Sequence, residues 1–411
     1  MGPRADENLR GHGAVAAEAG GPHDDAPGRS PNVPSRWRAL GQVLRVLAVS
    51  LLVGWAALEL QLRFLRVPGS AINVFKDFHR ADARLGWTGR PDVALRFRER
   101  SFDVLIEQGE DGFRRPNPPP PAEAPRRVLF LGDSLLWGWG VEQGELVTDE
   151  LQRRLGPGVA IENRAVSSYG TAQELLLLQD LLGRRHYDAV VLVFSRTDPE
   201  DNVDDMKLRP AFRLVDGRLE QVRWPPPEEA DRPLSGFLRS TSLAFRFAEA
   251  QWGELRRWID GKRGRQPADR RSVAPEETDF RKLPGYDLTR ELLREMQRLV
   301  AAHGASFVVA YQPHHVFPVG SPEAATRAAR DLVVDLCSSL GVPLVDVGGA
   351  FVGHRDDLVI PNDGHWTSAG HLAVAAALLD SPDFRAAIAG APPTATARTS
   401  AAASPAGAPP P

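Results

Sequence analysis

The sequence has almost no cysteine. Cys337 is the only cysteine among 411 residues, so the chain cannot form an internal disulfide bond. It lies in "DLVVDLCSSL", a pattern typical of a helix face, and we interpret it as a small buried hydrophobe and not as a reactive thiol. The histidines, cysteine and carboxylates also lack the spacing of a metal site, so we predict no metal and no other cofactor.

A strong excess of charge of one sign is missing as well. The chain carries 50 lysines and arginines against 53 aspartates and glutamates, a net charge of -3, which gives no electrostatic reason to expect binding to nucleic acid. With 42% hydrophobic residues the composition is that of a globular protein, and the length suffices for one large domain with appendages. Neither property indicates the oligomeric state.

Both ends lack hydrophobic periodicity. The first 35 residues mix Gly, Pro, Ala and charged residues, and the last stretch, "APPTATARTSAAASPAGAPPP", is of low complexity. Such segments cannot bury enough apolar surface to offset the entropy lost on ordering. We therefore predict disordered tails over residues 1–35 and 386–411.

The chain contains one long hydrophobic run. Its uncharged part, Val46–Leu58, is too short to cross a hydrocarbon core, whereas Ala39–Leu62, about 24 residues, is long enough. We predict an uncleaved single-pass anchor over residues 36–66 in the cytoplasmic membrane, with the main domain extracytoplasmic, although arginines on both flanks weaken the charge bias. A buried or interfacial amphipathic helix stays as an alternative, and so does a cleaved signal peptide, for which no small-residue cleavage site follows.

Residues 67–125 have no long helical pattern. The stretch "ALRFRERSFDVLIEQGEDGFRRP" alternates apolar and polar residues and contains an Asp-Gly turn, which favours a short β ribbon or an extended arm. The following "PNPPPPAEAP" has the composition of a stiff linker and places a domain boundary near residue 125.

Strand and helix patterns alternate over residues 126–385. The expected strands are Val128–Leu131, Val159–Asn163, Ala189–Phe194, Ser306–Pro313 and Pro343–Val347. The expected helices are Glu145–Arg154, Thr171–Leu182, Leu288–His303, Pro322–Leu340 and Thr367–Leu379. This alternation predicts an α/β fold with a doubly wound, flavodoxin-like, five-stranded parallel sheet. Residues 200–285 interrupt it with a predicted hairpin at "FRLVDGRLEQV" and a further helical stretch, and we interpret them as a lid-like insertion that shapes a substrate cleft.

Ser134 follows the first of these strands. In "RRVLFLGDSLLWGWGV" a buried strand runs into Gly-Asp-Ser, which places a hydroxyl at the carboxyl edge of the sheet, where ligands bind. A serine is a good nucleophile only when a base takes its proton and a third group orients the base. Asp363 and His365 in "PNDGHW" suit these roles, because their spacing lets the carboxylate reach the imidazole Nδ1 while Nε2 faces Ser134. The neighbouring Asp133 is expected to cap or brace the loop.

The two motifs resemble those of the SGNH, or GDSL, hydrolase superfamily, and in particular its membrane-anchored bacterial members with an Asp-x-His ending. "NRAVSSYGTAQELL" is similar to the family's second block, "VLVFSRTDPEDN" to its third, and "DGFRRP" to the arm that precedes the core. The resemblance covers roughly residues 80–385. It implies a serine ester hydrolase with Ser134 as nucleophile, His365 as general base and Asp363 as the orienting carboxylate.

The resemblance also implies an oxyanion hole with three donors. Two are backbone N–H groups, one from Ser134 and one from the second block, where the family's glycine aligns with Ser168 or, after a small shift, with Gly170. The third is an asparagine side chain in the family, and Thr197 stands at its position. Because threonine has one hydroxyl donor on a shorter side chain, either it substitutes, or Asn202 or Arg196 reaches in, or the enzyme is slow.

Aromatic and histidine side chains flank the predicted site. Trp137 and Trp139 follow the nucleophile closely, and they either line an acyl or sugar pocket or pack in the core. His314 and His315 follow the fourth strand toward the same edge of the sheet, and they either contact the substrate or lie in a surface turn. Two histidines alone are too few to hold a metal.

The reaction that these residues indicate is hydrolysis of O-acyl esters, above all O-acetyl esters, through an acyl-enzyme. The expected substrate is an acylated glycan or lipid outside the cytoplasm, since the predicted anchor leaves the domain on that side. Two alternatives stay open. One is an O-acetyltransferase that passes the acyl group to a sugar hydroxyl with the same triad. The other is a non-catalytic glycan-binding or assembly protein that kept the triad and lost the oxyanion donor at Thr197.

Overall fold

The computed structural model describes most of the chain. The described residues are 35–65, 77–99, 101–203, 209–222, 242–245, 247–248, 252, 281, 285–312, 323–351, 355–361 and 363–390. They belong to two compact units, Met1–Ala57 and Leu58–Pro411. His314, His315, nearly all of both predicted tails and most of the second half of the predicted insertion lie outside the described residues.

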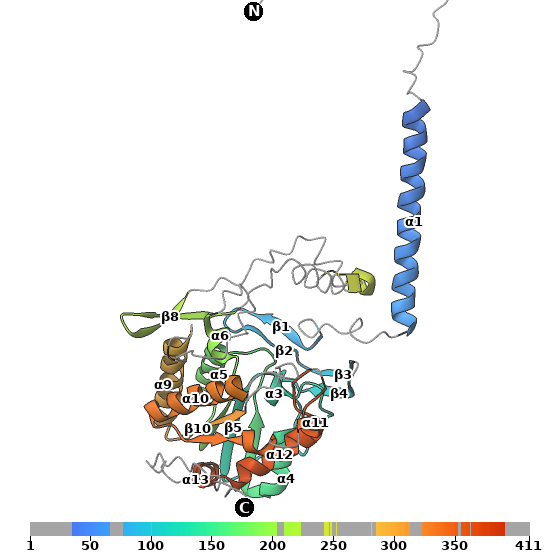
Figure 1. The fold of residues 1–411 in the computed structure, drawn as a ribbon. Helices are drawn as coiled ribbons and strands as arrows, with labels where there is room; N and C mark the ends of the chain where they lie inside the picture. The colour runs from blue at the N-terminus through green and yellow to red at the C-terminus, as the bar shows by residue number, and fades with distance from the viewer. Residues whose placement is uncertain are drawn as a thin grey trace, which may run out of the picture. The chain divides into compact units, whose positions relative to one another are not determined.

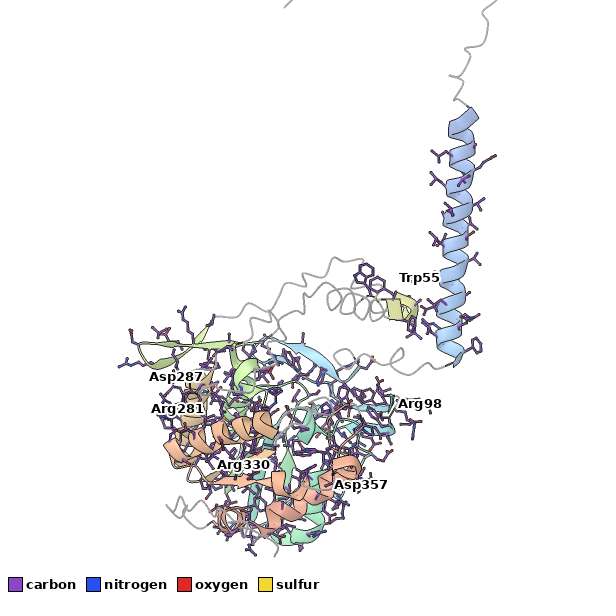
Figure 2. The ribbon with its side chains drawn as sticks, in the orientation of Figure 1. Trp55, Arg98, Arg281, Asp287, Arg330 and Asp357 are labelled. Atoms are coloured by element: carbon purple, nitrogen blue, oxygen red, sulfur yellow. The ribbon has the colours of Figure 1, made fainter. Side chains whose placement is uncertain are left out.

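Helix α1 (Ser35–Leu65) is a single continuous helix. Its segment Ala39–Phe64 has 26 residues, and the most apolar part of it has a mean hydropathy of 1.9 and no buried residue, whereas Leu62 near its end is buried. At about 1.5 Å per residue this segment is longer than the roughly 30 Å of a hydrocarbon core. Large apolar side chains such as Leu51 and Leu52 are more than 70% exposed along it (Figure 2). The predicted apolar helix therefore forms, and within the described residues it is the only one long and apolar enough to cross a membrane.

Two antiparallel hairpins lie upstream of the main sheet, and only the second of them falls in the stretch predicted as a β ribbon. The first pairs β1 (His79–Asp82) with β2 (Gly86–Gly89), and the second pairs β3 (Val93–Arg98) with β4 (Asp103–Gln108). In the second hairpin, β4 has the period-two pattern of a strand with one buried face, with Val104 and Ile106 buried, whereas β3 buries only Val93 and Phe97.

The main sheet has five parallel strands in the order β11-β10-β7-β5-β6 (Figure 1). Their bounds are β5 Arg126–Gly132, β6 Val159–Asn163, β7 Ala189–Ser195, β10 Ser306–Gln312 and β11 Leu344–Asp346. Read from β6, this is the flavodoxin-like order, with the second strand outside the first and the third on the other side, so the predicted fold class is confirmed. The strand order reverses between β5 and β7, and ligands bind at the carboxyl end of such a switch point.

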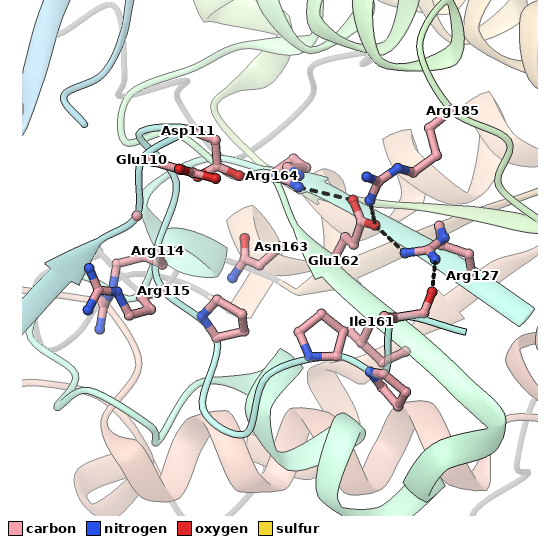
Figure 3. A pocket seen from close by; sticks show the side chains of 15 residues that line it. Glu110, Asp111, Arg114, Arg115, Arg127, Ile161, Glu162, Asn163, Arg164 and Arg185 are labelled. Carbon is pink, nitrogen blue, oxygen red and sulfur yellow. Dashed lines mark hydrogen bonds and ion pairs between the residues drawn. The ribbon is translucent and has the colours of Figure 1, made fainter. Parts of the chain in front are cut away.

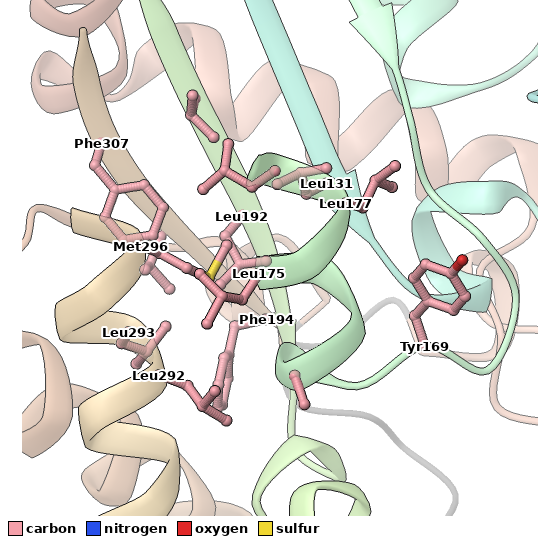
Figure 4. Close-up of a cluster of buried hydrophobic side chains, with 14 of the residues drawn as sticks. Leu131, Tyr169, Leu175, Leu177, Leu192, Phe194, Leu292, Leu293, Met296 and Phe307 are labelled. Atoms are coloured by element: carbon pink, nitrogen blue, oxygen red, sulfur yellow. The ribbon is translucent and has the colours of Figure 1, made fainter. Parts of the chain in front are cut away.

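Helices cover both faces of the sheet (Figure 1). On one face lie α5 (Thr171–Leu182), α9 (Tyr286–Ala302) and α10 (Glu323–Leu340), and on the other lie α4 (Val147–Leu155), α12 (Ser368–Asp380) and α13 (Pro382–Ile388). Each face of the sheet has its own hydrophobic core, and successive strand residues point to opposite faces. Leu129 and Leu131 belong to the core on the first face, and Val128 and Phe130 to the core on the second. Figure 4 shows the first core, where strand side chains meet those of α5 and α9.

The remaining elements are short. They are α3 (Ser134–Trp137), η1 (Gly156–Gly158), α6 (Asp198–Val203), the hairpin of β8 (Ala211–Val215) and β9 (Arg218–Val222), η3 (Val347–Phe351) and α11 (Arg355–Leu358). The predicted hairpin inside the insertion is thus present.

The predicted C-terminal tail begins too early. Helix α13 runs to Ile388, past residue 386, and Phe384 in its first turn is fully buried. The Ser381 hydroxyl accepts a hydrogen bond from the Phe384 N–H, and Pro382 occupies the first helical position. A serine cap followed by proline is a recognised signal for the start of a helix. The seven residues of α13 that follow this signal are too few to show a clear helical periodicity.

Candidate active site

Ser134 is the first residue of helix α3, directly after strand β5. The turn between them is tight: a Cβ on Gly132 would lie 3.0 Å from the Cβ of Leu136 and 3.3 Å from that of Val193. Only glycine lets the helix fold back onto the strand without displacing these atoms. Asp133 caps the helix, because its carboxylate accepts a hydrogen bond from the Leu135 N–H. The Gly-Asp-Ser sequence therefore fixes the serine at the carboxyl edge of the sheet.

Arg114, in the arm, holds the other end of helix α3. Its Nη1 donates hydrogen bonds of 3.0 Å to the carbonyls of Trp137 and Gly138, and its Nη2 donates one of 3.3 Å to the carbonyl of Val141. The side chain is 2% exposed, and although burial lowers the pKa of Arg114 to about 10, it stays charged at neutral pH. Helices leave their last carbonyls unpaired, and this guanidinium satisfies them. Sequence reasoning did not single out Arg114, although it lies in the quoted "DGFRRP".

The turn after α11 brings His365 to the serine. Its Nε2 lies 2.8 Å from the Ser134 Oγ, although the two residues are 231 positions apart. Its Nδ1 hydrogen-bonds to Oδ1 of Asp363, which also accepts the backbone N–H of His365 at 3.2 Å. This places a proton on Nδ1 and leaves Nε2 as the acceptor for the serine hydroxyl. His365 is therefore in contact with both Ser134 and Asp363, the two residues predicted to form a triad with it.

The pKa of Asp363 suits its predicted role as the carboxylate partner of the base His365. Burial raises the pKa of Asp363, but hydrogen bonds and the charge of His365 outweigh burial and hold that pKa below its ordinary value. Asp363 is thus a carboxylate at neutral pH. A carboxylate on Nδ1 orients the ring and stabilises the imidazolium that forms when Nε2 takes a proton.

The two predicted tryptophans have different surroundings. Trp137 is 1% exposed and packs against Phe78 and under the guanidinium of Arg114, so it belongs to the core and is not placed to contact a substrate. Trp139 lies against the triad: its ring stacks on His365 with centroids 5.2 Å apart, and its Nε1 donates to Oδ2 of Asp363 at 3.2 Å.

Helices α3 and α5 both begin at residues of the predicted oxyanion hole, and their first backbone N–H groups are possible hydrogen-bond donors. Ser134 is the first residue of α3, and Gly170 is the N-cap of α5. Helices leave their first N–H groups without intrahelical partners, and no acceptor for either N–H exists among the described residues. A Cβ on Gly170 would lie 3.1 Å from that of Asp201, so a glycine suits this position. The N–H of Ser168, whose φ is +65°, likewise has no described acceptor.

The contacts of Asn202 exclude it as the side-chain donor of the predicted oxyanion hole. Its Oδ1 accepts the Ala172 N–H at 3.1 Å, its Nδ2 donates to the Thr289 hydroxyl at 2.9 Å, and the residue is 4% exposed. Asn202 therefore ties α5 to α9 and is not free to reach an oxyanion. The hydroxyl of Thr197 is partly exposed and lies 3.1 Å from that of Ser195.

Carboxylates are buried beside the nucleophile. Asp133, Glu174 and Asp198 are each at most 6% exposed. Burial raises the pKa of Asp133 to about 6, and burial together with neighbouring carboxylates raises the pKa of Glu174 and of Asp198 well above the ordinary value. The neutral forms of Glu174 and Asp198 are therefore favoured relative to those of exposed carboxyl groups. Among the described residues, no group of three or more His, Cys, Asp or Glu could hold a metal ion.

A cavity of about 380 Å³ lies at the edge strand β6, apart from the triad (Figure 3). It is lined by Gly109, Glu110, Asp111, Arg114, Arg115, Pro116, Pro120, Pro121, Ala122, Arg127, Ile161, Glu162, Asn163, Arg164 and Arg185. Arginines dominate its wall, but Arg127, Arg164 and Arg185 all pair with Glu162, whose pKa stays at about 2 despite its burial. Glu162 thus compensates one of these three positive charges, and Asp111, which also pairs with Arg164, compensates a second. No triad residue lines this cavity.

Fold and site together define a class: a flavodoxin-like α/β domain with a Ser-His-Asp arrangement at the carboxyl edge of its sheet. No protein-family model matches the chain, and no curated protein matches it in sequence.

Solved structures of lipolytic enzymes resemble it distantly. A member of the lipolytic G-D-S-L family from Veillonella parvula is 9% identical, with 62% of this chain and 97% of that chain covered and a TM-score of 0.36. The esterase EstA from Pseudoalteromonas sp. is 13% identical, covering 62% and 96%, with a TM-score of 0.36. An acetyl xylan esterase from Geobacillus stearothermophilus is 12% identical, covering 62% and 94%, with a TM-score of 0.36. Likenesses this distant do not identify a family, so the activity has to be argued from the site.

Proposed function

We propose that this protein is a serine esterase that hydrolyses O-acyl esters through an acyl-enzyme. The observation that supports this most strongly is the 2.8 Å contact between the Ser134 Oγ and the His365 Nε2, with Asp363 on the other ring nitrogen. A nucleophile, a base within hydrogen-bond reach and an oriented base are the parts that acyl transfer needs.

In the proposed reaction, His365 takes the Ser134 proton as the Oγ attacks the ester carbonyl carbon. The tetrahedral intermediate collapses, the bond to the leaving alcohol breaks, and the alcohol takes the proton from the His365 Nε2. Water then attacks the acyl group on Ser134 while giving a proton to His365. The acid is released as the proton returns to the serine. Asp363 stays ionised throughout and holds the imidazole in one tautomer.

The proposed oxyanion hole uses the N–H groups of Ser134 and of Gly170 or Ser168. These are backbone donors without described acceptors, and two of them lie at helix N-termini, where the helix dipole favours negative charge. The proposed third donor is the hydroxyl of Thr197. A donor set of this kind typically lowers the barrier by several kcal/mol, about 10²–10³ in rate for each donor.

The proposed location is the cytoplasmic membrane, with the α/β domain on the extracytoplasmic side. The support for it is the exposed apolar helix α1, because an apolar surface of that size is unfavourable in water and favourable in a bilayer. The proposed substrate is then an O-acylated, above all O-acetylated, glycan or lipid on that side of the membrane.

Hydrolysis of p-nitrophenyl acetate by the full-length protein and by its Ser134→Ala and His365→Ala variants tests the proposal. We expect turnover by the wild type and almost none by either variant, with circular dichroism unchanged. Substantial turnover by Ser134→Ala would exclude the proposed nucleophile. Analysis of the products with an acetylated sugar and a second, unacetylated sugar separates free acetate, which hydrolysis predicts, from acetyl transfer.

A further inference from the structure

The carboxylate of Asp363 has two oxygens with different partners. Oδ1 accepts both contacts from His365, one from Nδ1 and one from the backbone N–H. Oδ2 accepts the indole N–H of Trp139 at 3.2 Å. A carboxylate held at one oxygen only can rotate about its Cβ–Cγ bond, and this rotation would move Oδ1 out of the imidazole plane. The indole donor fixes the second oxygen and therefore the plane of the group.

The same indole also covers the imidazole. The rings of Trp139 and His365 are stacked, with centroids 5.2 Å apart and an interplanar angle of 21°. An aromatic face attracts a cation placed over it, and the imidazole becomes a cation when it takes the serine proton. One side chain thus contacts both members of the pair that activates Ser134.

Trp139 is itself held by the hairpin β3–β4 of the arm. Phe97 meets its ring edge-on, with centroids 4.9 Å apart at 85°, and Phe102 packs edge-on against Phe97 at 5.0 Å. The next residue, Gly140, is equally enclosed: a Cβ there would lie 2.8 Å from Phe102 and 2.6 Å from Ile360. The arm is therefore packed against the two loops that carry Trp139 and the Asp363–His365 turn.

We propose that Trp139 is a positioning residue of the triad and that the β3–β4 hairpin keeps it in place. This inference rests on the proposed esterase reaction. Trp139 touches neither the reacting ester nor the Ser134 oxygen in this role. It acts through the orientation of Asp363 and through the charge that His365 acquires. The arm, which precedes the α/β domain in the chain, thereby becomes part of the active site.

Replacing Trp139 by phenylalanine tests the indole donor. Trp139→Phe keeps an aromatic face over His365 and removes the N–H that holds Oδ2. We expect kcat for p-nitrophenyl acetate to fall roughly 10- to 100-fold with KM little changed, as for loss of one hydrogen bond to a charged group. The acidic limb of kcat/KM should move to higher pH, because the indole N–H helps to hold the pKa of Asp363 below its ordinary value and the carboxylate that has lost this donor takes up a proton at higher pH.

A variant in the hydrophobic core shows whether a general loss of stability explains the lower kcat and the shifted acidic limb. Phe384, buried in α13 against Phe130, lies outside the site. Phe384→Leu should lower the melting temperature and leave the acidic limb where it is. If Trp139→Phe does not fold, 3-benzothienylalanine at position 139 replaces the N–H by sulfur within nearly the same shape, and it should give the same shift.

An NMR measurement of the His365 Nδ1 proton separates this inference from the esterase proposal, because it needs no activity. In a Ser134→Ala background, we expect the downfield signal of this proton to shift and to exchange faster with water when phenylalanine replaces tryptophan at position 139, because Asp363 has then lost the donor on its second oxygen. If the wild type shows no hydrolysis but this signal changes, the esterase proposal fails and the positioning contact stands. An unchanged kcat, an unchanged acidic limb and an unchanged proton signal would overturn the role of Trp139.

Discussion

Thr197 has one hydroxyl proton, and two acceptors compete for it in the proposed reaction. One is the Ser195 hydroxyl, 3.1 Å away, and the other is the oxyanion of the tetrahedral intermediate. Because Ser195 can itself donate, the Thr197 proton is free to turn toward the oxyanion when charge develops there. At the scale of single residues, this hydroxyl decides whether the proposed oxyanion hole has a side-chain donor.

Thr197→Val should lower kcat/KM by roughly 10- to 1,000-fold, about 1.4–4 kcal/mol of transition-state stabilisation, because valine keeps the shape and removes the donor. Ser195→Ala is the matched control, since it removes the competing hydroxyl and leaves Thr197 its proton. Steady-state kinetics with p-nitrophenyl acetate measure both. A Thr197→Val enzyme as fast as the wild type would mean that backbone N–H groups build the hole without Thr197.

Glu174 is a second residue whose chemistry can be measured directly. It is 1% exposed, and neither carboxylate oxygen has a hydrogen-bond partner among the described residues. Its pKa in the folded state is raised above the ordinary 4.5, so the folded protein keeps a proton that the unfolded chain loses above that pH. Its contribution to stability is therefore complete below about pH 4.5 and is lost as the pH rises toward the folded pKa.

Glu174→Gln should remove this dependence. Near pH 8 we expect the variant to be more stable than the wild type by about 1–3 kcal/mol, the cost of an unpaired buried charged group, with little difference near pH 4. Thermal unfolding at both pH values, followed by circular dichroism, gives the comparison. Equal pH dependence in the two proteins would show that Glu174 does not titrate as the structure indicates.

At the scale of elements, the arm and the helix that carries the nucleophile form one unit. The guanidinium of Arg114 joins them by hydrogen bonds to the carbonyls of Trp137, Gly138 and Val141. No other described element donates to the carbonyls of Trp137 and Val141. The position of Ser134 thus depends on a residue twenty positions before it in the chain.

Arg114→Met should lower the free energy of unfolding by about 2–4 kcal/mol, because buried carbonyls lose a charged donor. The neighbouring Arg115 is exposed, and Arg115→Met should change that free energy by less than about 0.5 kcal/mol. Urea unfolding of the two variants compares them under identical conditions. Equal stability of Arg114→Met and the wild type would contradict the role of the guanidinium.

The elements of the sheet could be predicted, because each strand is a short apolar run between turn residues and because helices such as α4 and α9 have one apolar face. The central strand Ala189–Ser195 is buried at every position, as its continuous apolar run indicates. The contact between Trp139 and Asp363 could not be predicted, because it joins residues 224 positions apart and no local pattern records it. Helix α13 was missed because its signal is only the Ser381 cap and one proline.

At the scale of the whole molecule, the proposed membrane location depends on helix α1. Full-length protein should partition with membranes and resist extraction by salt or alkali, because Ala39–Phe64 exposes a continuous apolar surface. A chain that begins at Lys76 lacks this helix and should be soluble. Fractionation followed by N-terminal sequencing checks both statements. A soluble full-length protein would contradict the anchor, and an N-terminus trimmed beyond Leu62 would show a cleaved signal instead.

The central claim is that His365 activates Ser134 for attack on an acyl carbon, and covalent labelling tests it most directly. A fluorophosphonate probe reacts with an activated serine, and peptide mapping by mass spectrometry locates the adduct. We predict a single adduct on Ser134 in the wild-type protein, none in Ser134→Ala, and strongly slowed labelling in His365→Ala. An unlabelled wild-type protein with intact circular dichroism, or an adduct at another residue, would contradict the claim and indicate a binding protein built on a hydrolase fold.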